Sequence, residues 1–338
     1  MTAAERPVRW GILSTASITS QLVPAIREAG AEVVAVASRD HGRAEEHARQ
    51  HGIERAYGSY AELYADADVE VVYVATPNAL HAECTAQALA AGKHVLCEKP
   101  MTLTAAEAEE LFALADRSGL RLMEAFMYRH HPQTHRLKEL ARDGTIGELH
   151  SIHASFHFRV EDPGSDHRYS RTLGGGALRD VGGYCISAAT YVLDAEPARI
   201  HGVARMASSG VDERTFGLLE FDDGVVVTVD CSLDTEMVSR VTVLGSDGRV
   251  WVDNPFLPDA LWVWGDSAPP MEIYVGRGAA ITTIPSTDRS TYVLEAEGFS
   301  RAVRGHGAQE VSPEETLRNL RISDRLRDAT WSSPSGRR

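Results

Sequence analysis

The segment Lys93-His94-Val95-Leu96-Cys97-Glu98-Lys99-Pro100 is a short apolar stretch that ends abruptly in an acid, a base and a proline. A Val-Leu-Cys run is typical of a strand buried in a parallel sheet, where both faces are covered. Proline cannot donate to a sheet ladder, so Pro100 marks the carboxyl end of the strand. Ligands of open α/β sheets bind beyond these ends, which makes Glu98 and Lys99 candidates for ligand contact. The alternative is a solvated ion pair that caps the strand.

Strands alternate with helices throughout the first 126 residues. This alternation predicts a doubly wound parallel sheet with helices on both faces, and a first domain over residues 1–126. Strands are expected at residues 8–13, 32–38, 56–57, 69–75, 93–100 and 120–126.

The pattern changes after Phe126, and most later segments are strands in hairpin-like succession. Asp222-Asp223-Gly224 and Ser246-Asp247-Gly248 are turn signals between them. We expect a second, α+β domain over residues 127–338, with a large, mostly antiparallel open sheet that serves substrate binding and oligomerisation. A terminal helix over residues 313–330 is able in this scheme to pack back on the first domain. The expected strands are 148–159, 199–207, 213–221, 224–233, 238–245 and 248–253.

Composition bounds the class of protein. The 338 residues are 43% hydrophobic and 24% charged, as in an ordinary globular protein of two domains that share a cleft. A net charge of −14 argues against nucleic acid and anionic membrane as partners. The four cysteines lie far apart in apolar runs, which indicates buried free thiols. No signal peptide or membrane-length apolar run is evident, so we expect a cytoplasmic protein. The histidine clusters have no ligand partners at metal-binding spacing, and no metal is expected.

The first strand is followed by a turn in which a dinucleotide fingerprint would lie. Its three glycines would fall at Ser14, Ala16 and Thr19, and none of these is glycine. Small side chains still allow the backbone to approach a pyrophosphate at a helix N-terminus. We therefore assign Ser14, Thr15, Ala16 and Ile18 to cofactor contact.

The second strand ends in Ser38-Arg39, where an acid usually binds the adenosine ribose of NAD. A hydroxyl and a guanidinium instead suit a 2′-phosphate, which predicts NADP as the cofactor, with NAD possible. The alternative is that Arg39 begins a surface loop and pairs with Asp40.

Residues 174–184, Gly-Gly-Gly-Ala-Leu-Arg-Asp-Val-Gly-Gly-Tyr, begin as a glycine loop and continue as a helix to about Leu193. Asp180 and Tyr184 are four residues apart, so they share one helix face. The glycines permit a close backbone approach to some other group. The alternative is a flexible loop before a core helix whose tyrosine packs inward.

Together these segments resemble the glucose–fructose oxidoreductase and inositol dehydrogenase (Gfo/Idh/MocA) family over essentially the whole chain. The resemblance also rests on Thr76-Pro77-Asn78 with His81, and on the run Met123–Pro132. That run is similar to the subgroup of NADP-dependent D-xylose dehydrogenases, dihydrodiol dehydrogenases and nucleotide-sugar ketoreductases. The family resemblance implies a Rossmann domain followed by a substrate domain.

The resemblance also implies roles for individual residues. Lys99 and Tyr184 would be the catalytic pair, and Asp180 would orient the substrate or the tyrosine. In this interpretation Thr76, Asn78, His81, Glu98 and Lys99 line the cofactor, while Arg129, His167, Arg168 and Asp180 contact the substrate. A tyrosine is a weak base at neutral pH because its reference pKa is about 10, and a nearby ammonium lowers it.

Three functions are compatible with these residues. The first is an NADP-dependent aldose 1-dehydrogenase that oxidises a D-xylose-like sugar to its lactone. The second is an NADPH-dependent ketoreductase of a nucleotide-linked keto-sugar, or a trans-dihydrodiol dehydrogenase; Arg159, Arg168 and Arg171 would serve a diphosphate. The third is a non-catalytic NADP-binding regulator, although a proton-transfer pair is of no use to a sensor. A homodimer through the second domain's sheet is expected, because that sheet has more strands than its few helices cover.

Overall fold

The computed structural model describes residues 6–258 and 271–331, and the chain forms two compact units. Unit 1 consists of Met1–Thr102, Ala106–His130 and Ser290–Pro313, and unit 2 consists of Leu103–Ala105, His131–Arg289 and Glu314–Arg338. The division therefore differs from the expected boundary at residue 126. The segment that returns to the first unit is 290–313, whereas the terminal helix lies almost entirely within unit 2.

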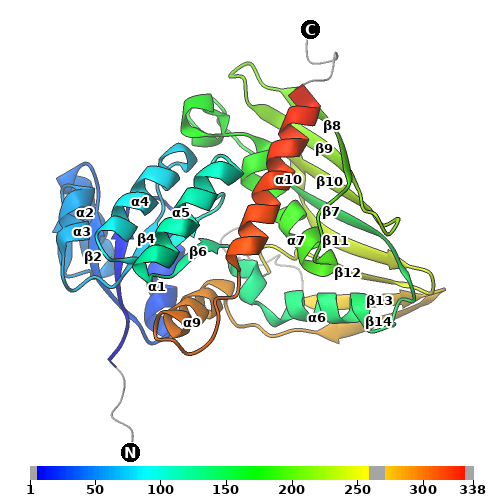
Figure 1. Ribbon diagram of the computed structural model, residues 1–338, viewed down its shortest axis with the longest axis horizontal. Helices are drawn as coiled ribbons and strands as arrows, with labels where there is room; N and C mark the ends of the chain where they lie inside the picture. The colour runs from blue at the N-terminus through cyan, green and yellow to red at the C-terminus, as the bar shows by residue number, and fades with distance from the viewer. Residues whose placement is uncertain (1–5, 259–270, 332–338) are drawn as a thin grey trace, which may run out of the picture. The chain divides into compact units, whose positions relative to one another are not determined.

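Six parallel strands form the sheet of unit 1, in the order β3-β2-β1-β4-β5-β6 (Figure 1). Every strand predicted for this region is present, and the predicted doubly wound sheet is confirmed. The chain order reverses between β1 and β4, and open α/β sheets bind their ligands at such a switch point. The strands are β1 (Arg9–Leu13), β2 (Glu32–Ala37), β3 (Arg55–Tyr57), β4 (Val71–Val74), β5 (His94–Glu98) and β6 (Leu122–Ala125).

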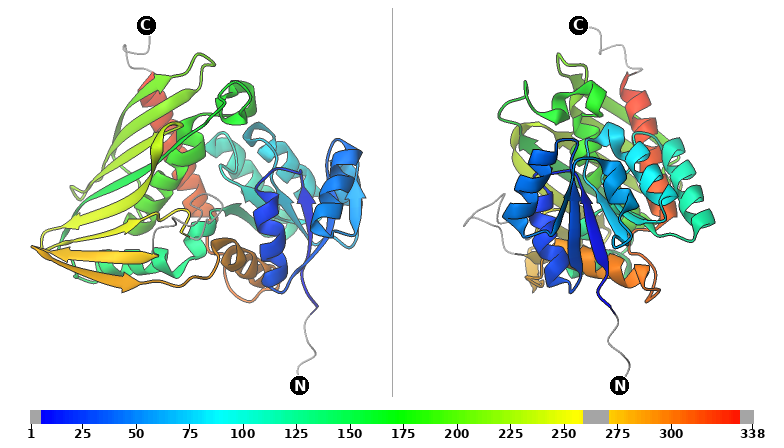
Figure 2. Two further views of the ribbon diagram at one scale, coloured as in Figure 1. Left: turned by 180° about the vertical axis from the view of Figure 1, so that it is seen from behind. Right: turned by 90° about the vertical axis from the view of Figure 1, so that its left-hand side faces the viewer.

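Helices pack on both faces of this sheet, as Figure 2 shows from the side. One of them, α9, was not predicted and comes from the returning segment. It packs on α1, and Trp10 of β1 contacts it through the ring of Phe299 and through a hydrogen bond of 3.3 Å to Ser300 Oγ. The helices are α1 (Thr19–Glu28), α2 (His41–His51), α3 (Tyr60–Ala65), α4 (His81–Ala90), α5 (Ala105–Ser118) and α9 (Thr291–Val303).

Eight strands form the sheet of unit 2, in the order β14-β13-β12-β11-β7-β10-β9-β8. Neighbouring strands are antiparallel except for β7 and β10, which confirms the predicted mostly antiparallel sheet. The hairpin β13–β14 was not predicted. The strands are β7 (Leu149–Arg159), β8 (Arg199–Met206), β9 (Asp212–Glu220), β10 (Val226–Ser232), β11 (Asp234–Gly245), β12 (Arg249–Asp253), β13 (Glu272–Arg277) and β14 (Ala280–Pro285).

Three helices cover one face of this sheet: α6 (Pro132–Arg142), α7 (Gly183–Leu193) and α10 (Pro313–Trp331) (Figures 1 and 2). Helix α10 lies against β8 and β9 at two glycines. A Cβ atom on Gly202 or Gly217 would lie 2.6 or 2.8 Å from a methyl carbon of Leu326, so only glycine allows this approach.

The opposite face of the unit 2 sheet is mixed in character, whereas the sequence predicted an apolar face. Val203, Phe216 and Val238 are 57%, 44% and 43% exposed on it. Strand alternation also places charged residues on the same face, and cross-strand register pairs Arg240 with Asp253. The uncovered surface therefore carries the apolar pair Val203 and Phe216, with Asp230 beside Phe216, and Val238 lies apart from this pair on β11.

The described residues contain buried cysteines but neither a membrane-length apolar helix nor a metal-binding group. The four cysteines are buried free thiols, as predicted. Among the described helices, none combines the length and the apolarity needed to cross a membrane. Within residues 6–258 and 271–331, no group of three or more histidine, cysteine or acidic side chains is arranged to hold a metal ion.

Candidate functional site

The carboxyl edge of the unit 1 sheet brings the predicted cofactor residues together. Ser14, Ser38, Thr76 and Lys99 follow β1, β2, β4 and β5, which are neighbours in the sheet. The backbone N–H of Ser14 donates to the carbonyl of Ala37 at 2.9 Å, so the first two of these turns are bonded directly. The predicted residues therefore line one edge, at the switch point where dinucleotides bind in this architecture.

The loop between β1 and α1 begins with a glycine-like backbone conformation although the fingerprint glycines are missing. Ser14 has φ +101°, a conformation that usually requires glycine. The N-cap residue of α1, Ile18, provides no side-chain hydrogen bond to the helix N-terminus. The backbone N–H groups of Thr19, Ser20 and Gln21 donate to the carbonyls of Ala16, Ser17 and Ile18 at 3.0–3.1 Å, so the first turn of the helix is already hydrogen-bonded to the backbone. Thr19, at the third glycine position, instead holds the loop, because its hydroxyl donates to the Ala16 carbonyl at 2.6 Å.

The Ser38-Arg39 segment has the chemistry expected for a 2′-phosphate. Asp40, proposed as an alternative partner of Arg39, caps α2 by accepting a hydrogen bond of 3.1 Å from the Arg43 N–H. Arg39 lies near Tyr60 on α3: burial raises the pKa of Tyr60, and Arg39 opposes that shift. The guanidinium is thus placed beside an aromatic ring next to the predicted adenosine site.

Glu98 and Lys99 stand at the end of β5 on a rigid support. The hydroxyl of Tyr73, a fully buried residue on β4, donates to Glu98 Oε1, and the Lys99 N–H donates to Glu98 Oε2 at 3.2 Å. Burial, and then the neighbouring Glu98, raise the pKa of Tyr73 well above its usual value, so it remains a donor. The backbone after β5 is fixed in turn by Glu124, which accepts from the Met101 N–H at 2.9 Å.

His81 joins the turn after β4 to the turn after β5. Its ring is 1% exposed, with Nδ1 2.8 Å from the Pro100 carbonyl and Nε2 2.7 Å from the Thr76 carbonyl. Both ring nitrogens face carbonyl acceptors; a neutral imidazole donates one hydrogen bond, and an imidazolium donates two. Burial lowers the pKa of His81, and these two contacts oppose that shift. His81 therefore orders two segments of the cofactor edge, while Asn78 begins a short 3₁₀ turn (Asn78–Leu80) between them.

Glu295 on α9 is a buried acid that the sequence analysis missed. It is 1% exposed, and burial followed by the charge of Glu98 raises its pKa well above the usual value. The raised pKa favours the neutral form of Glu295 near the Glu98 carboxylate. No local pattern marks it, because a helical segment 197 residues further along the chain supplies it.

In unit 2, the group that lies close to the glycine loop is the protein's own backbone at Arg168. A Cβ atom on Gly175 would lie 2.2 Å from the Arg168 carbonyl, which also accepts a hydrogen bond of 2.9 Å from the Gly176 N–H. Gly176 has φ +122°, which also favours glycine. The glycines therefore hold the loop that carries His167 and Arg168 against the helix that carries Tyr184.

Asp212, the first residue of β9, anchors the start of that helix and was also missed. Its Oδ2 accepts two hydrogen bonds of 2.7 Å, from the Leu178 N–H and from Thr215 Oγ1. Burial raises its pKa above the usual value. The anchored segment, Leu178–Gly182, is a π-helical turn directly before α7, and such turns are frequent at functional sites.

Arg168 and Asp180, both predicted to contact substrate, form an ion pair. Arg168 Nε lies 2.7 Å from Asp180 Oδ2, and its Nη1 lies 3.1 Å from Asp166 Oδ2. The charge of Asp180 is the largest influence and raises the pKa of the Arg168 guanidinium. Burial lowers this pKa, and the charge of Asp166 raises it again. One cation is thus shared by two carboxylates, which leaves the cluster with a formal charge of −1.

Tyr184 lies in an aromatic cluster beneath this ion pair. It is 4% exposed, and its ring centroid lies 5.5 Å from that of Phe156 and 5.3 Å from that of Phe256. Ring contacts of this kind fix the direction of the phenol. The packing of the Tyr184 ring in this cluster is therefore compatible with a catalytic role for its hydroxyl group.

The other two predicted substrate residues differ in their accessibility. His167 is half exposed, and its Nδ1 lies 3.5 Å from Asp166 Oδ1. Arg129 is 1% exposed, and its Nη2 lies 3.4 Å from Glu310 Oε1. This burial favours a structural role for Arg129 over the predicted substrate contact.

Unit 1 has the sheet of a dinucleotide-binding domain, and unit 2 has a glycine-loop helix with Asp180 and Tyr184. These are features expected of a two-domain nicotinamide-dependent oxidoreductase. Residues 8–126 match the model of the oxidoreductase family with an NAD-binding Rossmann fold, and residues 134–251 match the GFO/IDH/MocA C-terminal domain. The chain belongs to the Gfo/Idh/MocA family of oxidoreductases.

Among its relatives is D-xylose 1-dehydrogenase (NADP(+)) 2 of Haloferax volcanii, which is 38% identical over 320 residues, or 94% of this chain and 95% of the relative. The trans-1,2-dihydrobenzene-1,2-diol dehydrogenase of Sus scrofa is 37% identical over 264 residues, 77% of this chain and 78% of the relative. A crystal structure of KijD10, a 3-ketoreductase from Actinomadura kijaniata, in complex with NADP and TDP-benzene superposes with a TM-score of 0.88 at 33% identity. It covers 96% of this chain and 98% of the ketoreductase. The protein is thus an NAD(P)-dependent enzyme, and the regulator hypothesis is not supported.

Proposed function

We propose that the protein is an NADP-dependent aldose 1-dehydrogenase that oxidises the anomeric hydroxyl of a neutral, D-xylose-like sugar to a lactone. The observation that carries this proposal is the pairing of Arg168 with Asp166 and Asp180. Arg168 is one of the three arginines considered for a diphosphate, and its charge is compensated by these two carboxylates. The negative charge of this cluster instead favours hydroxyl groups, which donate to carboxylates.

The proposed proton transfer uses Tyr184 and Lys99. When bound, the nicotinamide accepts the hydride from the anomeric carbon. The phenolate of Tyr184 accepts the proton of the anomeric hydroxyl, and the Lys99 ammonium stabilises that phenolate and donates a hydrogen bond to the reacting oxygen. The carboxylate of Glu98, the residue before Lys99, is held by a hydrogen bond from the Tyr73 hydroxyl.

NADP as the preferred cofactor is supported by Ser38 and Arg39, with Asp40 occupied as the cap of α2. The relative from Haloferax volcanii is named as NADP-dependent, and the ketoreductase was crystallised with NADP. Four buried thiols support a reducing compartment, and we propose the cytoplasm.

The experiment that tests this function measures NADPH absorbance in two parallel series. The first offers NADP⁺ with free aldoses, and the second offers NADPH with dTDP-linked keto-sugars. We expect turnover in the first series and little in the second. Turnover with keto-sugar nucleotides alone would assign the second function, for which the Actinomadura kijaniata relative is the precedent.

We also propose a homodimer through the uncovered face of the unit 2 sheet. Val203 and Phe216 are cross-strand partners and form the centre of an exposed apolar patch on that face. Such a patch is usually an interface. Light scattering should give a dimer for the parent protein and a monomer for Phe216→Glu; a monomeric parent protein would refute the proposal.

A further inference from the structure

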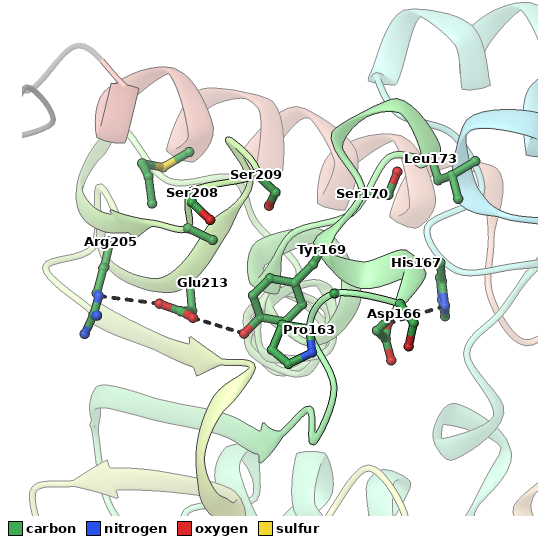
Figure 3. Close-up of a pocket in the computed structure, with 14 residues that line it drawn as sticks. Pro163, Asp166, His167, Tyr169, Ser170, Leu173, Arg205, Ser208, Ser209 and Glu213 are labelled. Atoms are coloured by element: carbon green, nitrogen blue, oxygen red, sulfur yellow. Dashed lines mark hydrogen bonds and ion pairs between the residues drawn. The ribbon is translucent and has the colours of Figure 1, made fainter.

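A cavity of about 600 Å³ opens beside the Arg168 cluster, entirely within unit 2 (Figure 3). One wall is the loop of residues 163–173, and the other is formed by the end of β8, the turn after it and the start of β9. Cavities of about 300–1,000 Å³ hold small organic ligands. This one is therefore large enough for a substrate unit beyond the reacting sugar ring.

The lining of the cavity is polar but electrically compensated. Its charged members are Arg205, Asp166 and Glu213, which give a formal charge of −1 with His167 neutral. Arg205 Nε lies 3.4 Å from Glu213 Oε2, and the Tyr169 hydroxyl donates to Glu213 Oε1 at 3.2 Å. Asp166 is already paired with Arg168, and Arg205 with Glu213, so the lining offers a neutral polyol acceptors for its hydroxyl groups rather than cations for a diphosphate.

Hydroxyl groups and a few apolar surfaces complete the lining. Serines come from both walls: Ser165 and Ser170 from one, Ser208 and Ser209 from the other (Figure 3). Pro163, Leu173 and Met206 supply apolar area. Carbohydrates present hydroxyl edges and C–H faces, and this combination of groups matches them.

The cavity shares a wall with the proposed site of reaction. Asp166 lines the cavity and holds Arg168, which in turn holds Asp180 on the π-helical turn directly before α7. A ligand that contacts Asp180 with its reducing end is therefore close to the cavity. We propose that this cavity is a subsite for a second, neutral sugar unit, so that the substrate is a reducing disaccharide. The inference rests on the proposed aldose dehydrogenase function.

The test compares kcat/KM for D-xylose and D-glucose with kcat/KM for xylobiose, cellobiose and maltose. We expect at least one disaccharide to exceed its own monosaccharide by about tenfold, the gain from one or two net hydrogen bonds. Ser209→Trp and Ser208→Trp fill the cavity from an exposed turn that tolerates large side chains. Both should abolish the advantage of the disaccharide and leave the monosaccharide value unchanged. Ser118→Trp, at an exposed site at the end of α5, is the matched control.

The outcomes separate the subsite from the function. Parental turnover of monosaccharides without any disaccharide advantage overturns the subsite and leaves the proposed function intact. A disaccharide advantage that survives both tryptophan variants also overturns it. Turnover confined to keto-sugar nucleotides overturns the function and the subsite together.

Discussion

Substitutions of Asp212 should show whether this residue positions the helix that carries Tyr184 or only stabilises the protein. One carboxylate oxygen accepts both the Leu178 N–H and the Thr215 hydroxyl at 2.7 Å. A hydrogen bond to a charged group contributes about 1.5–3 kcal/mol, so Asp212→Ala loses about 3–6 kcal/mol of interaction. Removing a partly buried charge also removes its desolvation cost and offsets part of this loss. The free energy of unfolding should therefore fall by about 2–4 kcal/mol. Asp212→Asn keeps one oxygen for both donors and should cost much less.

The same geometry predicts the kinetic effect. The Leu178 N–H begins the π-helical turn that holds Asp180, and Tyr184 follows it on α7. A catalytic group displaced by about 1 Å loses about a hundredfold in rate. We expect kcat of Asp212→Ala to fall by about ten- to a hundredfold with unchanged NADP affinity, and kcat of Asp212→Asn to remain near the parental value.

The assay pairs urea unfolding with steady-state kinetics, and Asp194→Asn is the control. Asp194 caps the other end of α7 with φ 54°, and its carboxylate pairs with Arg318 at 2.9 Å. Asparagine tolerates this conformation, so the control loses the ion pair but keeps the backbone. It should lose stability without losing kcat. Parental kcat in Asp212→Ala, or an equal loss of kcat in Asp194→Asn, would refute the role of Asp212 as a positioning residue.

Four further substitutions test the catalytic pair, the cofactor contact and the stability of unit 1. Tyr184→Phe should lower kcat by about a hundredfold or more, and Lys99→Ala should leave residual activity shifted to higher pH; a Tyr184→Phe variant with near-parental kcat excludes the assignment. Arg39→Ala should weaken NADP more than NAD in a fluorescence titration, and equal losses would contradict the 2′-phosphate contact. Burial favours a raised pKa for Glu70, but hydrogen bonds from Arg304 and Arg9 outweigh it and lower the pKa to about 2. This depressed pKa stabilises unit 1 above about pH 4.5 and loses its effect as the pH falls towards 2. Glu70→Gln should therefore cost about 1–2 kcal/mol at pH 7 after discount for exposure, and nothing at pH 2, by urea unfolding.

The strands of both sheets could be predicted because each carries a local signal. Buried parallel strands such as Val71–Val74 are continuous apolar runs, and the antiparallel strands are separated by Asp-Gly turns. The last hairpin, β13–β14, has no such signal, since its strand Ala280–Pro285 is largely exposed and its turn is Gly278-Ala279. Helix α9 was missed because its apolar face is defined by a partner distant in sequence, at Trp10.

The residues of the candidate site likewise fall into those that could be predicted from the sequence and those that could not. Glu98, Lys99 and Tyr184 lie in segments whose composition or family resemblance marks them. Asp212 and Glu295 do not, because each acts at a point that the chain reaches only after folding, 34 residues from Leu178 in one case and 197 from Glu98 in the other. A single sequence contains no local pattern for such contacts.

In the function that we propose, the distribution of charge allows an acidic protein to bind a phosphorylated cofactor and a neutral substrate. The net charge of −14 is spread over the whole chain, whereas a ligand responds to the charges within about 10 Å. At the cofactor edge, Arg39 and Lys99 are the nearby cations, and Asp40 is held away as a helix cap. In unit 2, Arg168 is the corresponding cation, but Asp166 and Asp180 together outweigh it. The same residue type thus serves opposite purposes: an arginine beside the adenosine site recruits phosphate, and an arginine bound by two carboxylates orients the acceptors that a sugar requires.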